Sequence, residues 1–291
     1  LVLLMTPALA LFYGGLVRTK STLNMMMMSF AAIGVGTIVW ILWGYSLAFA
    51  PDTGQGLIGD LTHVGLNGTL DTVVGGQGHE IPTLAFVMFQ MTFAIITVAL
   101  LSGAIADRAK FGAWVVFIIV WLTLIYSPVA HWAFAAQGGS GGWIIDKLGA
   151  LDFAGGTVVE INSGAAALAL AIVLGKRKGF KRDPMRPHNI PFILLGAGLL
   201  WFGWFGFNAG SALAAGHLAS VAMINTQIAT AAAAMSWIAY ERVRNGKPTT
   251  LGVASGAIAG AVAITPSCGF VTPLGALVIG LVGGVASAYA V

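Results

Sequence analysis

One carboxylate lies inside an apolar run of the sequence. Glu160 follows the stretch Asp152-Phe-Ala-Gly-Gly-Thr-Val-Val, and the apolar run continues beyond it to Gly175. From Phe153 onwards the run is long enough to span a bilayer, which needs about 20 residues. Glu160 then lies roughly 10 Å along a helix that rises 1.5 Å per residue. An ionised carboxylate facing lipid there would cost at least about 2.5 kcal/mol, so we predict that Glu160 faces a path through the protein.

The neighbours of Glu160 indicate what its side chain faces. Small residues recur at helical spacings from it, namely Gly156, Gly164, Ala167 and Ala171. Small side chains let helices approach closely, so this face is predicted to pack against other helices or to line a cavity. A carboxylate removed from water is a suitable proton acceptor for an N–H cation. The structural alternative is a protonated Glu160 that donates a hydrogen bond to a backbone carbonyl.

Two groups of aromatic residues could attract a cation. They are Phe86, Phe89 and Phe93 in the first, and Trp201, Trp204, Phe205 and Phe207 in the second. An aromatic face attracts a partly dehydrated cation by roughly 1–2 kcal/mol. The second group leads into Asn208-Ala-Gly-Ser211, where the Ser211 hydroxyl could accept a hydrogen bond from the cation. The structural alternative is a set of core, lipid-facing or interfacial aromatic residues.

Asp152 has two compatible roles, as a helix N-cap and as a negative charge that draws cations.

The composition defines the elements that must position these residues. The chain is 58% hydrophobic and 8% charged, with a mean hydropathy of +0.90, which predicts an all-α, polytopic helical membrane protein. The net charge of +4 does not indicate nucleic-acid binding, because the basic residues fall in short loops. The single Cys268 excludes an internal disulfide. No motif predicts an enzyme, a cofactor or a metal site.

Nine apolar segments can be drawn from hydropathy. They cover residues 1–15, 23–50, 82–105, 112–136, 153–175, 190–211, 218–240, 249–265 and 272–291. The last two are rich in Gly and Ala, with Gly252, Gly256 and Gly260 in one and Gly280 and Gly284 in the other, which predicts close helix packing. The first segment is short and the last stays apolar to its end, so we expect a chain cut at both ends.

Charge predicts the orientation of these segments. The loops after segments one, three, five and seven hold 13 of the 14 Lys and Arg residues. By the positive-inside rule those loops are cytoplasmic, and the N-terminus is outside. The predicted location is therefore the inner (plasma) membrane, with several passes. The inner loop 176–189 is strongly basic, which fits attraction to anionic lipid or, alternatively, a protein docking site.

Several of these stretches together resemble one family. They are Phe12-Tyr-Gly-Gly-Leu-Val-Arg18, Ile-Ala-Asp107-Arg108, Asp152-Phe-Ala-Gly-Gly-Thr-Val-Val159, Pro187-His-Asn-Ile-Pro191, Gly203-Trp-Phe-Gly-Phe-Asn-Ala-Gly-Ser211, Ser255-Gly-Ala-Ile-Ala-Gly260 and Ile264-Thr-Pro-Ser-Cys-Gly269. In order and spacing they are similar to the ammonium transporters, which include the methylammonium permeases and Rhesus-type proteins. The resemblance covers the whole chain. It implies the ammonium-transporter fold with inverted five-helix repeats, of which 1–291 would hold about nine of eleven helices in a single transmembrane domain.

The resemblance also implies roles for individual residues. Phe93, Phe134, Ser211 and Asp152 would recruit ammonium, with Trp204, Phe89 and Asn208 in secondary roles. Phe93 and Phe207 would form the pore gate. Phe134 stands where the family usually has Trp, and Trp132 and Trp143 are nearby alternatives. Glu160 stands where the family usually has the first of two pore histidines, as in certain fungal members, and would relay the proton.

Two functional hypotheses follow from the resemblance. The first is an ammonium or methylammonium transporter that recruits NH4+, deprotonates it and conducts NH3 through an apolar pore. The second is an ammonium sensor that binds the ion and signals to a fused or partner domain. The resemblance further implies a homotrimer in the lipid bilayer and a possible PII-type signalling partner at the cytoplasmic loops. It implies that the protein is not an enzyme.

Overall fold

The fold is built from apolar helices. The computed structural model describes residues 1–75, 80–136 and 141–291. Within these ranges, seven helices are long and apolar enough to cross a membrane: Thr19–Phe49, Thr83–Ala104, Phe111–Phe134, Gly156–Leu174, Ile190–Gly210, His217–Asn245 and Pro273–Ala290. Two shorter apolar helices, Val2–Leu16 and Thr250–Ile264, accompany them. Each coincides with a predicted segment to within a few residues, so the all-α polytopic fold class is confirmed.

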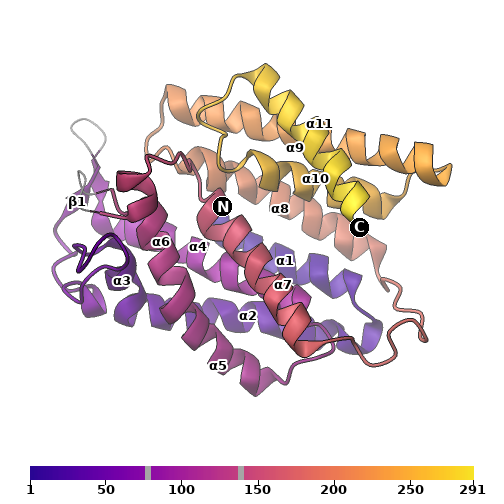
Figure 1. Cartoon of the computed structure of the whole chain (residues 1–291), viewed down its shortest axis with the longest axis horizontal. Coiled ribbons are helices and arrows are strands. Elements are labelled where there is room, and N and C mark those ends of the chain that lie inside the picture. Colours follow the sequence, from indigo (N-terminus) through magenta and orange to yellow (C-terminus); the bar gives the residue numbers. More distant parts are fainter. Residues whose placement is uncertain (76–79, 137–140) are drawn as a thin grey trace. The chain divides into compact units, whose positions relative to one another are not determined.

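Several spans are composed of more than one element (Figure 1). The α-helices in chain order are α1 (Val2–Leu16), α2 (Thr22–Val39), α3 (Tyr45–Phe49), α4 (Thr83–Ala104), α5 (Phe111–Trp121), α6 (Ser127–Phe134), α7 (Asn162–Leu174), α8 (Ile190–Gly210), α9 (His217–Asn245), α10 (Thr250–Ile264) and α11 (Pro273–Ala290). Turns of 3-10 helix occur at η1 (Thr19–Ser21) and η3 (Val64–Leu66).

The described residues also contain turns of π-helix. They are η2 (Trp40–Gly44), η4 (Leu122–Tyr126), η5 (Trp143–Lys147) and η6 (Gly156–Ile161). Three of them lie within membrane spans, where η2 joins α2 to α3, η4 joins α5 to α6, and η6 leads into α7. Isolated π-helical turns are rare and often mark functional positions. The turn η6 holds Glu160.

A small hairpin lies in the connection before α4. Strand β1 (Val73–Val74) pairs antiparallel with β2 (Ile81–Pro82), with Val73 opposite Pro82. Pro82 also immediately precedes the first residue of α4. His79, in the connection between the spans Thr19–Phe49 and Thr83–Ala104, lies outside the described residues.

The chain divides into two compact units, which we describe separately. Unit 1 comprises residues 1–26, 152–156 and 184–291, and unit 2 comprises residues 27–151 and 157–183. Unit 1 therefore contains α1 and α8 to α11. Unit 2 contains α3 to α7 and most of α2.

In unit 1, glycines let α10 and α11 approach α9, as the sequence predicts. A Cβ added at Gly256 would lie 2.9 Å from the Ala233 carbonyl oxygen, and one at Gly280 would lie 2.3 Å from the Ala229 carbonyl oxygen. These distances leave no room for a side chain. Helices α9, α10 and α11 lie against one another (Figure 1), and α1 packs on α8.

In unit 2, indole N–H groups link helices that are distant in sequence. Trp40 donates to the Val87 carbonyl at 3.2 Å, and Trp114 donates to the Met28 carbonyl at 3.0 Å. Both indoles are almost fully buried, so each bond satisfies a donor that would otherwise lose its water. Helix α7 packs against α4 in the same unit.

Candidate functional site

Glu160 lies near the start of its helix. The span begins at Gly156, so Glu160 is its fifth residue and lies about 6 Å from the start, not roughly 10 Å as predicted from Phe153. The cause is Asp152, whose Oδ1 accepts hydrogen bonds from the backbone N–H groups of Gly155 and Gly156 at 3.0 and 2.7 Å. These bonds hold the preceding turn out of the helix. The Asp152 carboxylate thus accepts from the first backbone N–H group of the span, whereas the residue directly before the span is Gly155.

The surroundings of Glu160 belong to unit 2. Its side chain is half-buried, and it lies within electrostatic range of Tyr126, which is fully buried. Tyr126 is the last residue of the π-helical turn η4. Two irregular helical turns thus place an acidic and a phenolic side chain within electrostatic range.

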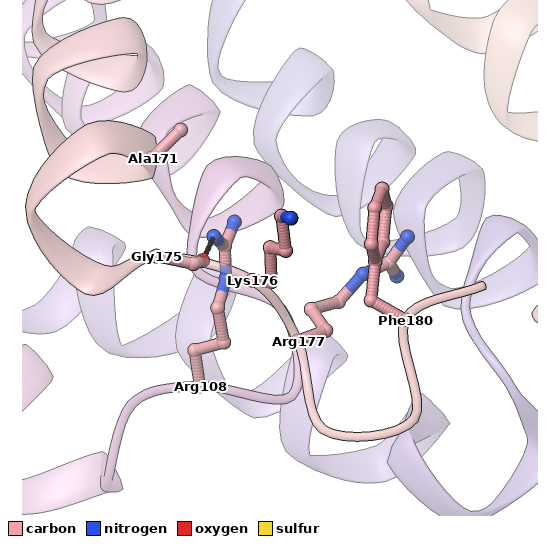
Figure 2. Close-up of a pocket in the computed structure, with 6 residues that line it drawn as sticks. All are labelled: Arg108, Ala171, Gly175, Lys176, Arg177 and Phe180. Carbon is pink, nitrogen blue, oxygen red and sulfur yellow. Dashed lines mark hydrogen bonds between the residues drawn. The ribbon is translucent and has the colours of Figure 1, made fainter. Parts of the chain in front are cut away.

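The small-residue face predicted around Glu160 is only partly packed. Gly156 lies against the Pro266 ring, where an added Cβ would come within 2.6 Å of it. Ala171 lines a pocket (Figure 2). Gly164 is exposed, and no described residue comes within 4 Å of where its Cβ would be. Helix α7 buries little of its surface against the described residues.

The first aromatic group lies on α4 in unit 2. Phe93 is fully buried, and its ring centroid lies 4.8 Å from that of Phe89, with the ring planes at 59°. The Thr97 hydroxyl donates to the Phe93 carbonyl at 2.6 Å. The two rings form a tilted pair at helical spacing, with Phe89 the more exposed member.

Phe134 is the last residue of α6 in unit 2 and is half-buried. The two alternative tryptophans lie close to each other, because the ring centroids of Trp132 and Trp143 are 5.7 Å apart. The Trp132 indole donates to the Leu57 carbonyl at 2.7 Å. This end of α6 therefore carries aromatic surface beyond Phe134.

The second aromatic group ends α8 in unit 1. Trp204 and Phe207 are almost fully buried, with ring centroids 5.8 Å apart. The Trp204 indole donates to the Thr265 hydroxyl at 2.9 Å, which links α8 to the residue that follows α10. Asn208 is fully buried and donates from Nδ2 to the Thr226 hydroxyl at 2.9 Å. Among the described residues, no hydrogen-bond donor reaches the buried Asn208 Oδ1.

Ser211 follows α8 directly and is half-buried. Its hydroxyl donates to the Phe207 carbonyl at 2.8 Å. A hydroxyl that donates in this way keeps its oxygen lone pairs for an incoming donor. The geometry therefore fits the predicted role of Ser211 as an acceptor.

The predicted site residues fall into two sets. Unit 1 brings together Trp204, Phe207, Asn208 and Ser211 along about two turns at the end of α8 and just after it. Unit 1 also holds Asp152, and the next residue, Phe153, donates its N–H to the Pro266 carbonyl at 2.9 Å. Unit 2 holds the others, which are Phe89, Phe93, Phe134 and Glu160.

Sequence reasoning missed a polar pair on α9. Asn225 and Thr226 are fully buried in unit 1. Asn225 Nδ2 donates to the carbonyls of Cys268 and Val271, both at 2.8 Å, and Thr226 accepts from Asn208. Adjacent amide and hydroxyl side chains inside an otherwise apolar segment are the sequence signal that could have revealed them.

Apolar spans, with an acidic residue inside one of them and aromatic clusters on others, define a polytopic helical membrane protein. The profile of the Ammonium Transporter Family matches residues 1–291, and the chain belongs to that family. Its relatives are named as ammonium transporters, not as enzymes.

Three comparisons illustrate the similarity. An ammonium transporter of Mycobacterium tuberculosis is 55% identical and covers 100% of this chain, which spans 64% of that protein. The crystal structure of Saccharomyces cerevisiae Mep2 is 38% identical, with a TM-score of 0.87, over 97% of this chain and 64% of that one. A structure named Sensor Amt Protein is 30% identical, with a TM-score of 0.89, over 99% of this chain and 71% of that one.

Proposed function

We propose that the protein transports ammonium across a membrane. The observation that carries this proposal is an acidic side chain, Glu160, within a membrane span of a chain that belongs to the ammonium transporters. An intramembrane carboxylate is functional by default, because its burial is costly. The relatives of similar sequence are named as ammonium transporters, which supports ammonium or methylammonium as the substrate class.

Recruitment of the cation is assigned to Phe93, Phe134, Ser211 and Asp152. Ser211 offers oxygen lone pairs, and the aromatic rings offer π faces that attract a partly dehydrated cation. Trp204, Phe89 and Asn208 act in secondary roles. The buried Oδ1 of Asn208 supports this role, because no donor among the described residues forms a hydrogen bond with it.

Conduction requires that the cation lose a proton. A bare cation in an apolar pore would carry a prohibitive desolvation cost, whereas neutral NH3 would not. NH3 would then pass the gate formed by Phe93 and Phe207, while Glu160 holds or relays the proton. Potassium would be excluded because it has no proton to give up.

Ammonium sensing is the second candidate function. The specific observation in its favour is the similarity to a structure named Sensor Amt Protein, at 30% identity and a TM-score of 0.89. A sensor would bind ammonium at the same residues without sustained transport. It would pass the signal to a fused or partner domain.

The assembly and location form part of the proposal. Residues 1–291 form one transmembrane domain, with inverted repeats, in a homotrimer. The protein lies in the inner (plasma) membrane with its N-terminus outside, because the basic loops alternate along the chain. A PII-type signalling protein would meet the cytoplasmic loops, of which 176–189 is the most basic.

Solid-supported membrane electrophysiology tests this function. Proteoliposomes that contain the protein are exposed to an ammonium pulse, and wild type is compared with Glu160→Gln and with a matched control, Glu80→Gln. Glu80 is exposed and lies outside the membrane spans. We expect a sustained current in wild type and in Glu80→Gln, and its loss in Glu160→Gln. A brief binding transient alone in wild type would favour the sensor and contradict the proton relay.

A further inference from the structure

Two asparagines of the chain are each followed directly by a glycine. The pairs are Asn67-Gly68 and Asn245-Gly246, and both asparagines are exposed. In such a pair the backbone nitrogen of the glycine can attack the side-chain amide of the asparagine, because glycine has no side chain to obstruct the approach. Sequence and exposure are alike at the two sites, so the backbone around each pair decides which of them can react.

The first pair forms the centre of a tight turn in unit 2. Asn67 has φ −58° and ψ 136°, Gly68 has φ +70°, and the Thr69 N–H donates to the Leu66 carbonyl at 3.3 Å. These are the features of a type II β-turn, which uses only the N–H of its fourth residue. Among the described residues, no acceptor reaches the Gly68 N–H. The nitrogen that would attack Asn67 is therefore available.

Only weak contacts hold this turn in place. Attack requires the Asn67–Gly68 peptide group to rotate toward the Asn67 side chain. The turn's own hydrogen bond, from Thr69 to Leu66, is long for an N–H···O bond. The His63 Nδ1 lies 3.0 Å from the Asn67 carbonyl oxygen, but this contact is exposed to water. No described residue lies within 4 Å of where a Gly68 Cβ would be, so the peptide group has room to rotate.

The second pair is held by a helix end in unit 1. Asn245 is the last residue of α9, and the Gly246 N–H donates to the Arg242 carbonyl at 3.1 Å. The Arg242 guanidinium donates in turn to the Gly246 carbonyl. Here the attacking nitrogen is already engaged, and the last turn of α9 must open before it can reach the asparagine. Local opening of this kind adds to the barrier.

We propose that Asn67 is a site of spontaneous deamidation in the folded protein, and that Asn245 is protected from it. The Gly68 nitrogen forms a bond with Cγ of Asn67, and the bond from Cγ to Nδ2 breaks. Nδ2 leaves as ammonia and carries away the proton that the Gly68 N–H gives up. One water molecule then opens the succinimide ring at either carbonyl, which yields an aspartate or an isoaspartate at position 67.

The modification changes the segment that leads into α4. Either product adds one negative charge, and isoaspartate also adds a methylene group to the backbone, which the type II turn cannot accommodate. The Thr72 hydroxyl donates to the Thr69 carbonyl at 3.3 Å, and the N–H of Thr83, the first residue of α4, donates to the Thr72 carbonyl at 2.9 Å. The turn is thus two hydrogen bonds away from the start of α4.

Peptide mass mapping of the full chain in detergent tests the proposal. The folded protein is incubated at neutral and at mildly alkaline pH, and each asparagine is followed by its mass gain of about 1 Da. Enzymatic methylation of isoaspartate identifies that product. Asn67→Gln and Asn245→Gln are matched variants that remove one site each. Short synthetic peptides, residues 62–72 and 240–250, give the rates of the two pairs without the fold.

We expect the two peptides to react at similar rates, and Asn67 in the folded protein to react at least about tenfold faster than Asn245. Asn67→Gln should remove most of the isoaspartate, and Asn245→Gln should leave it unchanged. Equal rates at the two sites of the folded protein would overturn the proposed selectivity. If Asn67 stays intact while its peptide reacts, the turn protects this residue and the proposal is wrong.

Discussion

The imidazole Nε2 of His131 lies 3.1 Å from the carboxylate Oδ1 of Asp52, although 79 residues separate the two in the chain. The other ring nitrogen, Nδ1, lies 3.0 Å from the Ala48 carbonyl oxygen. Both neighbours are acceptors, and only the imidazolium form can donate to both at once. The His131 side chain is fully buried and that of Asp52 is 11% exposed. The pair therefore ties the segment after α3 to α6.

This pair predicts a pH dependence of stability. Desolvation opposes ionisation of Asp52, but the Gly56 N–H and His131 outweigh it and lower the pKa of the carboxyl. A carboxyl whose pKa is lower in the folded than in the unfolded state stabilises the fold at any pH above the unfolded-state pKa of about 3.9. This stabilisation is lost as the pH falls through the folded-state pKa. We expect Asp52→Asn to unfold a few degrees lower at neutral pH and to lose less stability on acidification.

Thermal unfolding in detergent between pH 3 and 7 measures this effect. Asp60→Asn is the control, because Asp60 is only half-buried and its lowered pKa comes first from Thr62, which is exposed. A neutral-pH midpoint for Asp52→Asn equal to that of Asp60→Asn would show that the contact with His131 contributes nothing to stability.

Close packing of α11 on α9 predicts the outcome of two glycine substitutions. A Cβ at Gly280 would lie 2.3 Å from a backbone oxygen, which cannot move aside. Gly280→Ala should therefore destabilise the protein by about 1–3 kcal/mol. Gly198→Ala on α8, where no atom lies within 4 Å, should be neutral or stabilise by about 0.5–1 kcal/mol. Denaturant or thermal unfolding of the two variants measures this difference in stability. Equal unfolding midpoints would contradict the prediction that only Gly280 lacks room for a side chain.

Glu241 predicts a local stability effect where α9 meets α10. Its carboxylate accepts from the Thr249 N–H at 2.6 Å, from the Thr249 hydroxyl at 2.9 Å and from the Trp237 indole at 3.2 Å. Glu241→Ala leaves these donors without their acceptor and should cost about 1–3 kcal/mol. Glu241→Gln keeps one oxygen acceptor and should cost less. Equal unfolding midpoints for Glu241→Ala and Glu241→Gln would refute the role of the Glu241 side chain as an acceptor at the start of α10.

Ser211 predicts a change in ammonium affinity, given the proposed transport function. Ser211→Ala removes one acceptor worth about 1 kcal/mol, so the ammonium concentration for half-maximal current should rise about fivefold. Ser220→Ala is the matched control, because its hydroxyl also donates to the carbonyl four residues earlier, at 3.1 Å, but on α9. Concentration–response curves on solid-supported membranes measure both. An unchanged half-maximal concentration for Ser211→Ala would remove Ser211 from the recruitment site.

The fold was predictable because its dominant signals are local. Long apolar runs specify spans, and glycines spaced by four, such as Gly256 and Gly260, specify the face that packs. The helix start before Glu160 was predicted three residues early, because the Asp152 bonds to Gly155 and Gly156 are geometric and leave no trace in hydropathy.

The site was predictable only where residues lie within one motif. Trp204, Phe207, Asn208 and Ser211 share a helix end, so the sequence already places them together. Contacts across the chain were not foreseen, because Arg108 meets Gly175 and His131 meets Asp52 only after the helices pack. Nor does composition distinguish a π-helical turn from an α-helical one, since the same apolar residues occupy both.

Because Gly156–Ile161 is a π-helical turn, the deletion of one residue from it would change the direction in which the Glu160 side chain points. Each residue of an α-helix turns the chain by about 100°, and a π-helical turn accommodates one more residue than the regular helix would. Deletion of one residue from this turn could restore a regular helix with the same composition and nearly the same length. It would also rotate Glu160 by about a quarter of a turn relative to α7. Insertions or deletions within this turn, rather than substitutions, would therefore change the direction of the Glu160 side chain in related proteins.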